Sequence, residues 1–246
     1  MPRNPHMNSR RPKGAATKRL GRGKADVSRP KTGDWLLWQL ADSAFPTGGF
    51  AHSLGLEAAW QHGEVQNRVE LVSFLEAGLQ QLGQASLPFV MAAHAEVEKL
   101  AELDQLCDVF TTNHVANRAS RGQGRAFLAA VRRICRLAGE SQAVEAQFAH
   151  YAPVFGACLR QLDIDRETTA RMFFFNHLRS ILAAAVRLNI IGPMEAQMLQ
   201  QRLAITAEEI LVRCEPLTLD ELAQTSPLLD LWQGAQDRLY SRLFQS

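Results

Sequence analysis

The histidine and cysteine side chains of this chain are spaced too far apart to form a recognisable chemical motif. None of the four cysteines forms a C-x-x-C pair, and no two of the seven histidines stand three or four residues apart. Phosphate-binding glycine loops and the nucleophile, base and orienting group of a hydrolase are also missing from the sequence. A metal site built from distant segments or from two subunits remains open. The residue types alone therefore name no catalytic residue.

The stretch Leu36–Trp60 holds the densest set of backbone signals and is the first candidate site. Pro46 must end the helix that precedes it, and Gly48 with Gly49 permits a tight reversal or the close approach of another backbone. His52 stands at the entrance of the next helix. The residue types favour a buried corner between two helices, and a surface for a partner is the alternative.

Two polar ridges further along the chain are predicted either to face a partner or to stabilise the fold. Asn117 and Arg121 follow Asn113 in steps of four residues, so the three side chains would line one helix ridge. Asn176 lies on a later helix, with Arg179 beside its face. The Arg179 guanidinium would either bridge carboxylates across an interface or satisfy carbonyl groups at a helix end. Both interpretations stay open at both ridges.

The C-terminal segment, residues 227–246, is predicted to form a short helical tail with an apolar stripe. Tyr240 and Phe244 stand four residues apart and would project from one side of that helix, with Arg242 beside them. Such a stripe must be buried either against the body of the protein or in the groove of a partner. The residue types favour neither outcome.

The main part of the chain is predicted to be helical throughout. Apolar residues recur at spacings of three and four, and no sustained alternation of apolar and polar residues indicates a strand. Hydrophobic residues make up 46% of the sequence, which suffices for one sizeable core. We therefore predict an all-α fold in which residues 34–246 form a single compact domain of about ten helices.

Residues 1–33 differ sharply in charge from the rest of the chain. They hold ten Lys or Arg and one acid, which gives +9, whereas the remaining residues sum to −7. With almost no large apolar residue, this segment is predicted to be a disordered basic tail. It lacks the apolar core of a secretory signal, and no later stretch is apolar enough to span a membrane, so a cytoplasmic location is expected.

Five blocks of the sequence resemble the urease accessory protein UreF family. The first is ADSAFPTGGFAHSLGLEAA, which begins at Ala41, and the others follow in the family's order: NRASRGQGR, HYAPVFG, FFFNHLRSILAAAVRLNIIGP and PLLDLWQGAQDRLYSRLFQS. Together they extend the resemblance over nearly everything after Asp34. One position departs from the pattern, because Gln236 stands where the family usually has a histidine before Asp237. This departure puts a metal role of that position in doubt.

The resemblance implies a maturation factor without catalysis of its own that helps to insert nickel into urease. It implies a scaffold that bridges UreD/UreH and the GTPase UreG on apo-urease, usually as a homodimer. Nickel would be handled by the complex, with no cofactor bound stably by this chain. The residues that we expect at partner surfaces are Gly48, Gly49, His52, Asn117, Arg121, Asn176, Arg179, Asp237, Tyr240, Arg242 and Phe244.

Two other functions remain open. A regulator of the GTPase would supply an arginine in trans to stabilise charge during phosphoryl transfer, and Arg179 and Arg121 are the candidates. A nucleic-acid-associated protein would bind through residues 1–33 and would release its ligand as the salt concentration rises, although no interleaved aromatic residues offer base stacking. The scaffold, in contrast, would capture the GTPase with little change in its rate.

Overall fold

Helices account for the regular structure of the described chain. The computed structural model describes residues 32–135 and 146–246, so residues 1–31, with nearly all of the predicted basic tail, lie outside the described residues. The described ranges contain ten α-helices, several short helical turns and no strand. Residues Gly33–Ser246 form one compact unit. The predicted all-α fold is confirmed.

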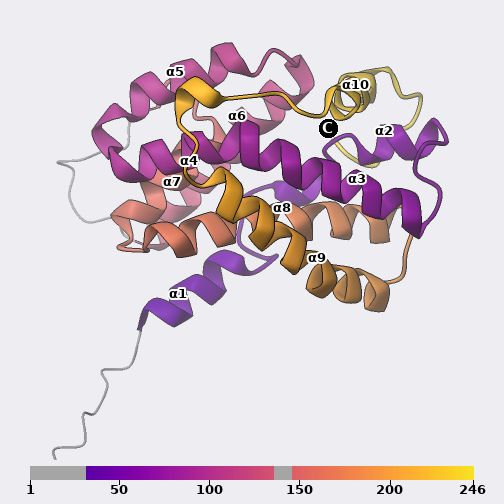
Figure 1. Ribbon diagram of the computed structural model, residues 1–246, viewed down its shortest axis with the longest axis horizontal. Coiled ribbons are helices and arrows are strands. Elements are labelled where there is room, and N and C mark those ends of the chain that lie inside the picture. Colours follow the sequence, from indigo (N-terminus) through magenta and orange to yellow (C-terminus); the bar gives the residue numbers. More distant parts are fainter. Residues whose placement is uncertain (1–31, 136–145) are drawn as a thin grey trace, which may run out of the picture. The chain divides into compact units, whose positions relative to one another are not determined.

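Figure 1 shows the arrangement of the helices. In chain order they are α1 (Thr32–Ala41), α2 (Leu56–Gln61), α3 (Arg68–Gln81), α4 (Leu87–Ala95), α5 (Leu100–Phe110), α6 (His114–Ile134), α7 (Tyr151–Gln161), α8 (Arg166–Arg187), α9 (Pro193–Cys214) and α10 (Pro227–Ala235). Within the described ranges, no helix combines the length and apolar character that crossing a membrane requires.

The starts of α3, α6 and α8 carry capping residues that can be read in the sequence. The Asn67 side chain accepts hydrogen bonds from two backbone N–H groups at the start of α3, and Asn113 does the same at the start of α6. Asp165 caps α8 by accepting from the Thr168 N–H at 2.8 Å. These caps satisfy N–H groups that have no partner inside the helix.

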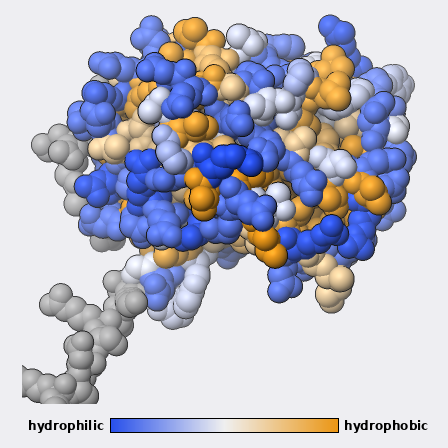
Figure 2. Space-filling model, viewed as in Figure 1, coloured by the Kyte–Doolittle hydropathy of each residue, from blue (hydrophilic) through white to orange (hydrophobic). Residues whose placement is uncertain are grey.

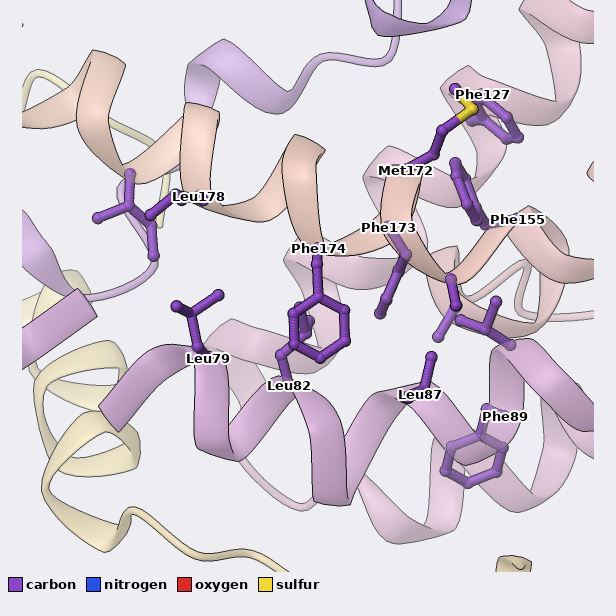
Figure 3. Packing of buried hydrophobic residues seen from close by; sticks show 14 of the residues in the cluster. Leu79, Leu82, Leu87, Phe89, Phe127, Phe155, Met172, Phe173, Phe174 and Leu178 are labelled. Carbon is purple, nitrogen blue, oxygen red and sulfur yellow. The ribbon is translucent and has the colours of Figure 1, made fainter. Parts of the chain in front are cut away.

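The core lies between α8 and the helices packed against it. Figure 3 shows Phe173, Phe174 and Leu178 of α8 pointing toward apolar side chains of α3, α4 and the π-helical segment between them. The ring centroids of Phe155 and Phe173 lie 5.5 Å apart, which ties α7 to α8. Because α8 packs against this core, its polar residues Thr169 and Asn176 are buried inside the molecule.

Candidate functional site

The C-terminal segment leaves the helix earlier than predicted. α10 ends at Ala235, a 3-10 turn covers Gln236–Arg238, and the following residues up to Ser246 are not helical. The N–H groups of Leu243 and Phe244 donate to the Glu57 carboxylate, at 2.6 and 3.1 Å, instead of to carbonyls of a preceding turn. The predicted helical pairing of Tyr240 with Phe244 is therefore wrong.

Glu57 of α2 is the buried acceptor that holds this segment. Its side chain is 1% exposed and accepts, besides the two backbone N–H groups, a hydrogen bond of 2.6 Å from Gln236 Nε2. The same Gln236 amide donates to the Phe244 carbonyl at 3.3 Å. A carboxylate can be buried in this way because the N–H donors replace water. The Gln236 side chain therefore links α2 to the C-terminal segment. We call the set of hydrogen bonds that Glu57 accepts from Gln236, Leu243 and Phe244 the Glu57 lock.

The last residues of the segment are fixed to the loop before α2 (Figure 1). The Gln245 N–H donates to the Ala51 carbonyl at 2.7 Å, and the Ser246 backbone oxygen accepts from the backbone N–H and the hydroxyl of Ser53. His52 Nδ1 shares a hydrogen bond of 2.5 Å with Ser246 Oγ. Burial, and then the charge of Arg118, lower the pKa of His52. His52, expected at a partner surface, thus contacts the chain's own C-terminal segment.

The glycines around this loop have different roles. Gly48 has a φ of 72°, so the tight reversal predicted for the paired glycines occurs there. A side chain on Gly49 would meet only the hydroxyls of Thr47 and Ser180, at 3.4 and 3.5 Å. The close backbone approach is at Gly55 instead, where a Cβ atom would lie 2.9 Å from the backbone nitrogen of Gln233 in α10. Gly55 was not singled out from the sequence.

The two aromatic residues of the C-terminal segment face opposite environments. Phe244 is 4% exposed, and the Arg187 guanidinium covers its ring, 4.2 Å from the ring centroid. Tyr240 is fully exposed, at 105%. It borders an open groove of about 390 Å³ between α2 and α10, where the His62 and Trp232 rings stack at 5.4 Å. One side of the segment thus closes the core, and the other side faces outward.

Asp237 joins the C-terminal segment to α6 at the surface. Arg118 binds its carboxylate with two hydrogen bonds, of 2.8 and 3.1 Å, and Arg242 adds one of 3.1 Å. His114 Nε2 lies 3.4 Å from the same carboxylate. Hydrogen bonding to Arg118 is the main cause that lowers the pKa of Asp237. Asp237 and Arg242, both expected at a partner surface, therefore contact each other.

The predicted polar ridge of α6 caps the end of α5. Asn117 Nδ2 donates to Asp108 Oδ1 at 3.0 Å and to the Thr111 carbonyl at 3.3 Å. Arg121 Nη1 lies 3.6 Å from Asp108 Oδ1, and its guanidinium covers the Phe148 ring at 4.8 Å. Both side chains remain partly accessible, so the ridge stabilises the fold and still lines the surface.

Some polar residues of α8 line a small, partly open pocket. Gly49, Asn176 and Arg179 line a space of about 70 Å³ together with Tyr151 and His177. Asn176 Oδ1 and His177 Nε2 are buried and have no hydrogen-bond partner among the described residues. Burial lowers the pKa of His177 to about 4 and raises that of Tyr151. A polar space of this size suits ordered water.

Arg179 satisfies a helix end, as one of its two predicted interpretations requires. Its guanidinium donates to the carbonyl of Ala41, the last residue of α1, and lies 5.7 Å from the Phe175 ring centroid. Burial lowers the pKa of Arg179.

The predicted residues therefore fall into separate groups. Gly49, Asn176 and Arg179 share one pocket, Gly48 lies in the turn before α2, and His52 and Phe244 are held around the C-terminal segment. The others, which lie at the surface near α6 and α10, are Asn117, Arg121, Asp237, Tyr240 and Arg242. The described residues contain no group of three or more His, Cys, Asp or Glu that could hold a metal ion. The sequence reasoning missed Glu57 as the centre of the lock. A lone acid within the apolar run LGLEAAW is the signal that could have found it, because a buried carboxylate must have donors.

Comparison with known proteins places the chain in one family. The model of the UreF family matches residues 65–204, more than half of the sequence. The chain belongs to the UreF family. "Urease accessory protein F" of Oryza sativa subsp. indica is 40% identical over 219 residues, which cover 85% of this chain and 84% of the relative. The protein of the same name from Arabidopsis thaliana is 40% identical over 221 residues, 86% of this chain and 92% of the relative.

More distant members of the UreF family match over a similar extent. The "Uncharacterized urease accessory protein UreF-like" of Schizosaccharomyces pombe is 29% identical over 225 residues, 84% of this chain and 94% of the relative. The resemblance inferred from the five sequence blocks is thus confirmed.

Proposed function

We propose that the chain is a urease maturation factor that works as a scaffold, bridging UreD/UreH and the GTPase UreG on apo-urease. Membership in the UreF family supports a role in urease maturation. The observation that carries the scaffold is the two-sided C-terminal segment: Phe244 and the Glu57 lock fix its inner side, while Tyr240 is left outside. A surface fixed before binding loses little conformational freedom when a partner docks.

The exposed apolar residues around α10 suit the docking of UreD/UreH. Leu231 and Tyr240 line the groove that contains Trp232, and Leu228 of α10 and Leu243 of the C-terminal segment are also exposed. Figure 2 shows apolar patches separated by hydrophilic side chains, and one of these patches lies over α10. Aromatic anchors next to smaller apolar residues are typical of interface centres.

Nickel is the cargo of the proposed complex and is not assigned to a site on this chain. The four cysteines are free thiols, which supports a reducing compartment such as the cytoplasm. In this proposal the chain contributes binding surfaces, and the GTPase contributes the nucleotide chemistry.

The outer face of α9 supports the proposed homodimer. Met198, Ile205 and Val212 are exposed and recur every seven residues, opposite the side of α9 that packs on the core. Two antiparallel copies related by a twofold axis at Ile205 would place Met198 against Val212. This pairing forms an apolar seam, while Glu208 beside it keeps its ion pair with Arg171 of the same chain.

The arginines required by the regulator hypothesis are engaged within the chain. Arg179 would have to leave the Ala41 carbonyl before it reached a nucleotide, and Arg121 contacts Asp108 and the Phe148 ring. These contacts support the scaffold over the regulator.

Co-purification with a rate measurement tests the proposed function. We expect the chain, co-expressed with UreD/UreH and UreG, to elute in one complex with both and to leave the rate of GTP hydrolysis nearly unchanged. A rate increase of about 10³-fold that is lost in Arg179→Ala, with binding retained, would favour the regulator instead. Failure of the chain to elute with either partner would contradict the scaffold.

A further inference from the structure

One face of α6 carries a row of basic side chains that the scaffold proposal does not use. His114, Arg118, Arg121 and Arg125 follow one another in steps of four, three and four residues, so they share one side of the helix. At 1.5 Å per residue the row extends over about 16 Å. With Thr111, Thr112 and Asn117, these side chains line an open groove of about 480 Å³.

A carboxylate of the chain itself already occupies one end of this row. Asp237 accepts two parallel hydrogen bonds from Arg118, at 2.8 and 3.1 Å, and lies 3.4 Å from His114. This two-point geometry is the preferred way in which arginine binds a carboxylate. The contact with Asp237 therefore shows that this row of side chains can bind a carboxylate.

The other end of the row is held less tightly. Arg121 approaches Asn117 Oδ1 at 3.5 Å and Asp108 Oδ1 at 3.6 Å, and Arg125 approaches the Phe148 carbonyl at 3.4 Å. These are long contacts for a group that offers five N–H donors. Both guanidinium groups thus keep donors for a second and third carboxylate.

We propose that this groove binds an acidic polypeptide segment of an assembly partner, with Arg121 and Arg125 taking carboxylates beside the one that Asp237 supplies. Side chains two residues apart in an extended peptide are about 7 Å apart. Residues four apart on a helix have Cβ atoms about 6 Å apart, so the spacings match. Asp108 and Asp237 contact Arg121 and Arg118 and so neutralise part of the row, which suits a few spaced carboxylates better than the continuous phosphates of a nucleic acid.

This inference deepens the proposed function, since it gives the chemistry of one partner surface, and a defined peptide tests it without the assembly. The probe is a fluorescent peptide with glutamate at every second position, and the same peptide with glutamine is its neutral control. Fluorescence anisotropy with the full chain at about 0.15 M salt measures the affinity, because exposed charges more than about 8 Å apart are then largely screened.

We expect the glutamate peptide to bind and the double variant Arg121→Gln, Arg125→Gln to weaken it at least about tenfold. The control variant is Arg133→Gln, Arg160→Gln, which removes the same charge from exposed positions outside the groove. The affinity of this control variant for the glutamate peptide should stay within about twofold of that of the unmodified chain. All variants keep residues 1–31, so any binding by that basic segment contributes equally.

Three results would overturn the proposal. The first is no binding of the glutamate peptide, and the second is equal weakening of its binding in both double variants. The third is a DNA oligonucleotide that binds more tightly than the peptide and loses this binding in the Arg121→Gln, Arg125→Gln variant.

Because Arg121 also contacts Asp108, the single variant Arg125→Gln is measured as well, together with its thermal melt. An unchanged melt with weaker peptide binding supports the groove, and unchanged peptide binding contradicts it. If the peptide fails while UreD/UreH and UreG still co-purify, the scaffold stands without this groove.

Discussion

Two carboxylates hold the same C-terminal segment, and they do so in opposite ways. Glu57 is buried and binds neutral N–H groups of Gln236, Leu243 and Phe244. Asp237 lies at the surface and binds the cations Arg118 and Arg242. Solvent competes with the contacts of Asp237 but not with those of Glu57. The buried lock should therefore determine stability, and the surface ion pairs should determine little of it.

Replacing the buried carboxylate should have the largest effect. Glu57→Leu keeps a side chain of similar size but leaves the three N–H donors without an acceptor, so we expect the free energy of unfolding to fall by about 3–5 kcal/mol. Urea unfolding measures this change, and Glu64→Leu at an exposed position is the control. A loss below about 1 kcal/mol would show that the lock is not important.

Removing the buried aromatic ring should have the next largest effect. Phe244→Ala leaves a cavity under Arg187 and should lower the free energy of unfolding by about 3 kcal/mol. Tyr240→Ala, four residues earlier and fully exposed, should change it by less than about 0.5 kcal/mol. Equal effects of the two substitutions in thermal melts would contradict the two-sided segment.

His177 extends the comparison to an imidazole whose buried Nε2 atom has no hydrogen-bond partner among the described residues. Burial lowers its pKa from 6.5 to about 4, so the unfolded chain binds a proton between these values and the folded chain does not. The stability supplied by neutral His177 is complete above pH 6.5 and is lost as the pH falls toward 4, on the order of 3 kcal/mol in all. His177→Leu should flatten the slope of unfolding free energy between pH 5 and 7. An unchanged slope would mean that the imidazole is solvated.

The surface carboxylate should give the smallest change. Asp237→Asn removes the ion pairs with Arg118 and Arg242, and we expect a loss of about 0.5–1 kcal/mol that shrinks further at high salt. Urea unfolding at two salt concentrations checks this. A loss as large as that of Glu57→Leu would remove the distinction between the two carboxylates.

The helices could be predicted from the sequence because their signals are local. Asn67, Asn113 and Asp165 cap helix starts, and apolar spacing marks the helices that follow. The C-terminal segment could not be predicted in this way. Its apolar spacing fits a helix, but its backbone N–H groups bind Glu57, which is more than 180 residues away in the chain. Long-range acceptors leave no periodic signal near the residues that they reorganise.

The residues of the candidate site also divide into those with a local signal and those whose role depends on distant contacts. Gly48 was recognised because a loop between two helices requires a positive φ, which is a local property. Gly55 also has a positive φ, of 88°, but its close contact with α10 could not be predicted because α10 is distant in the sequence. Arg179 was left with two interpretations, since its partner, the Ala41 carbonyl, could be identified only from the fold.

The central claim is that the exposed side of the C-terminal segment docks UreD/UreH, and affinity measured on a stable variant tests it most directly. Leu231→Ala, Tyr240→Ala removes two exposed side chains at the groove, and Leu106→Ala, Val109→Ala removes two exposed side chains of α5 as the control. We expect both variants to melt like the unmodified chain. Only the first should lose affinity for UreD/UreH, by about thirtyfold or more. A stable Leu231→Ala, Tyr240→Ala variant that binds UreD/UreH with unchanged affinity would contradict the claim.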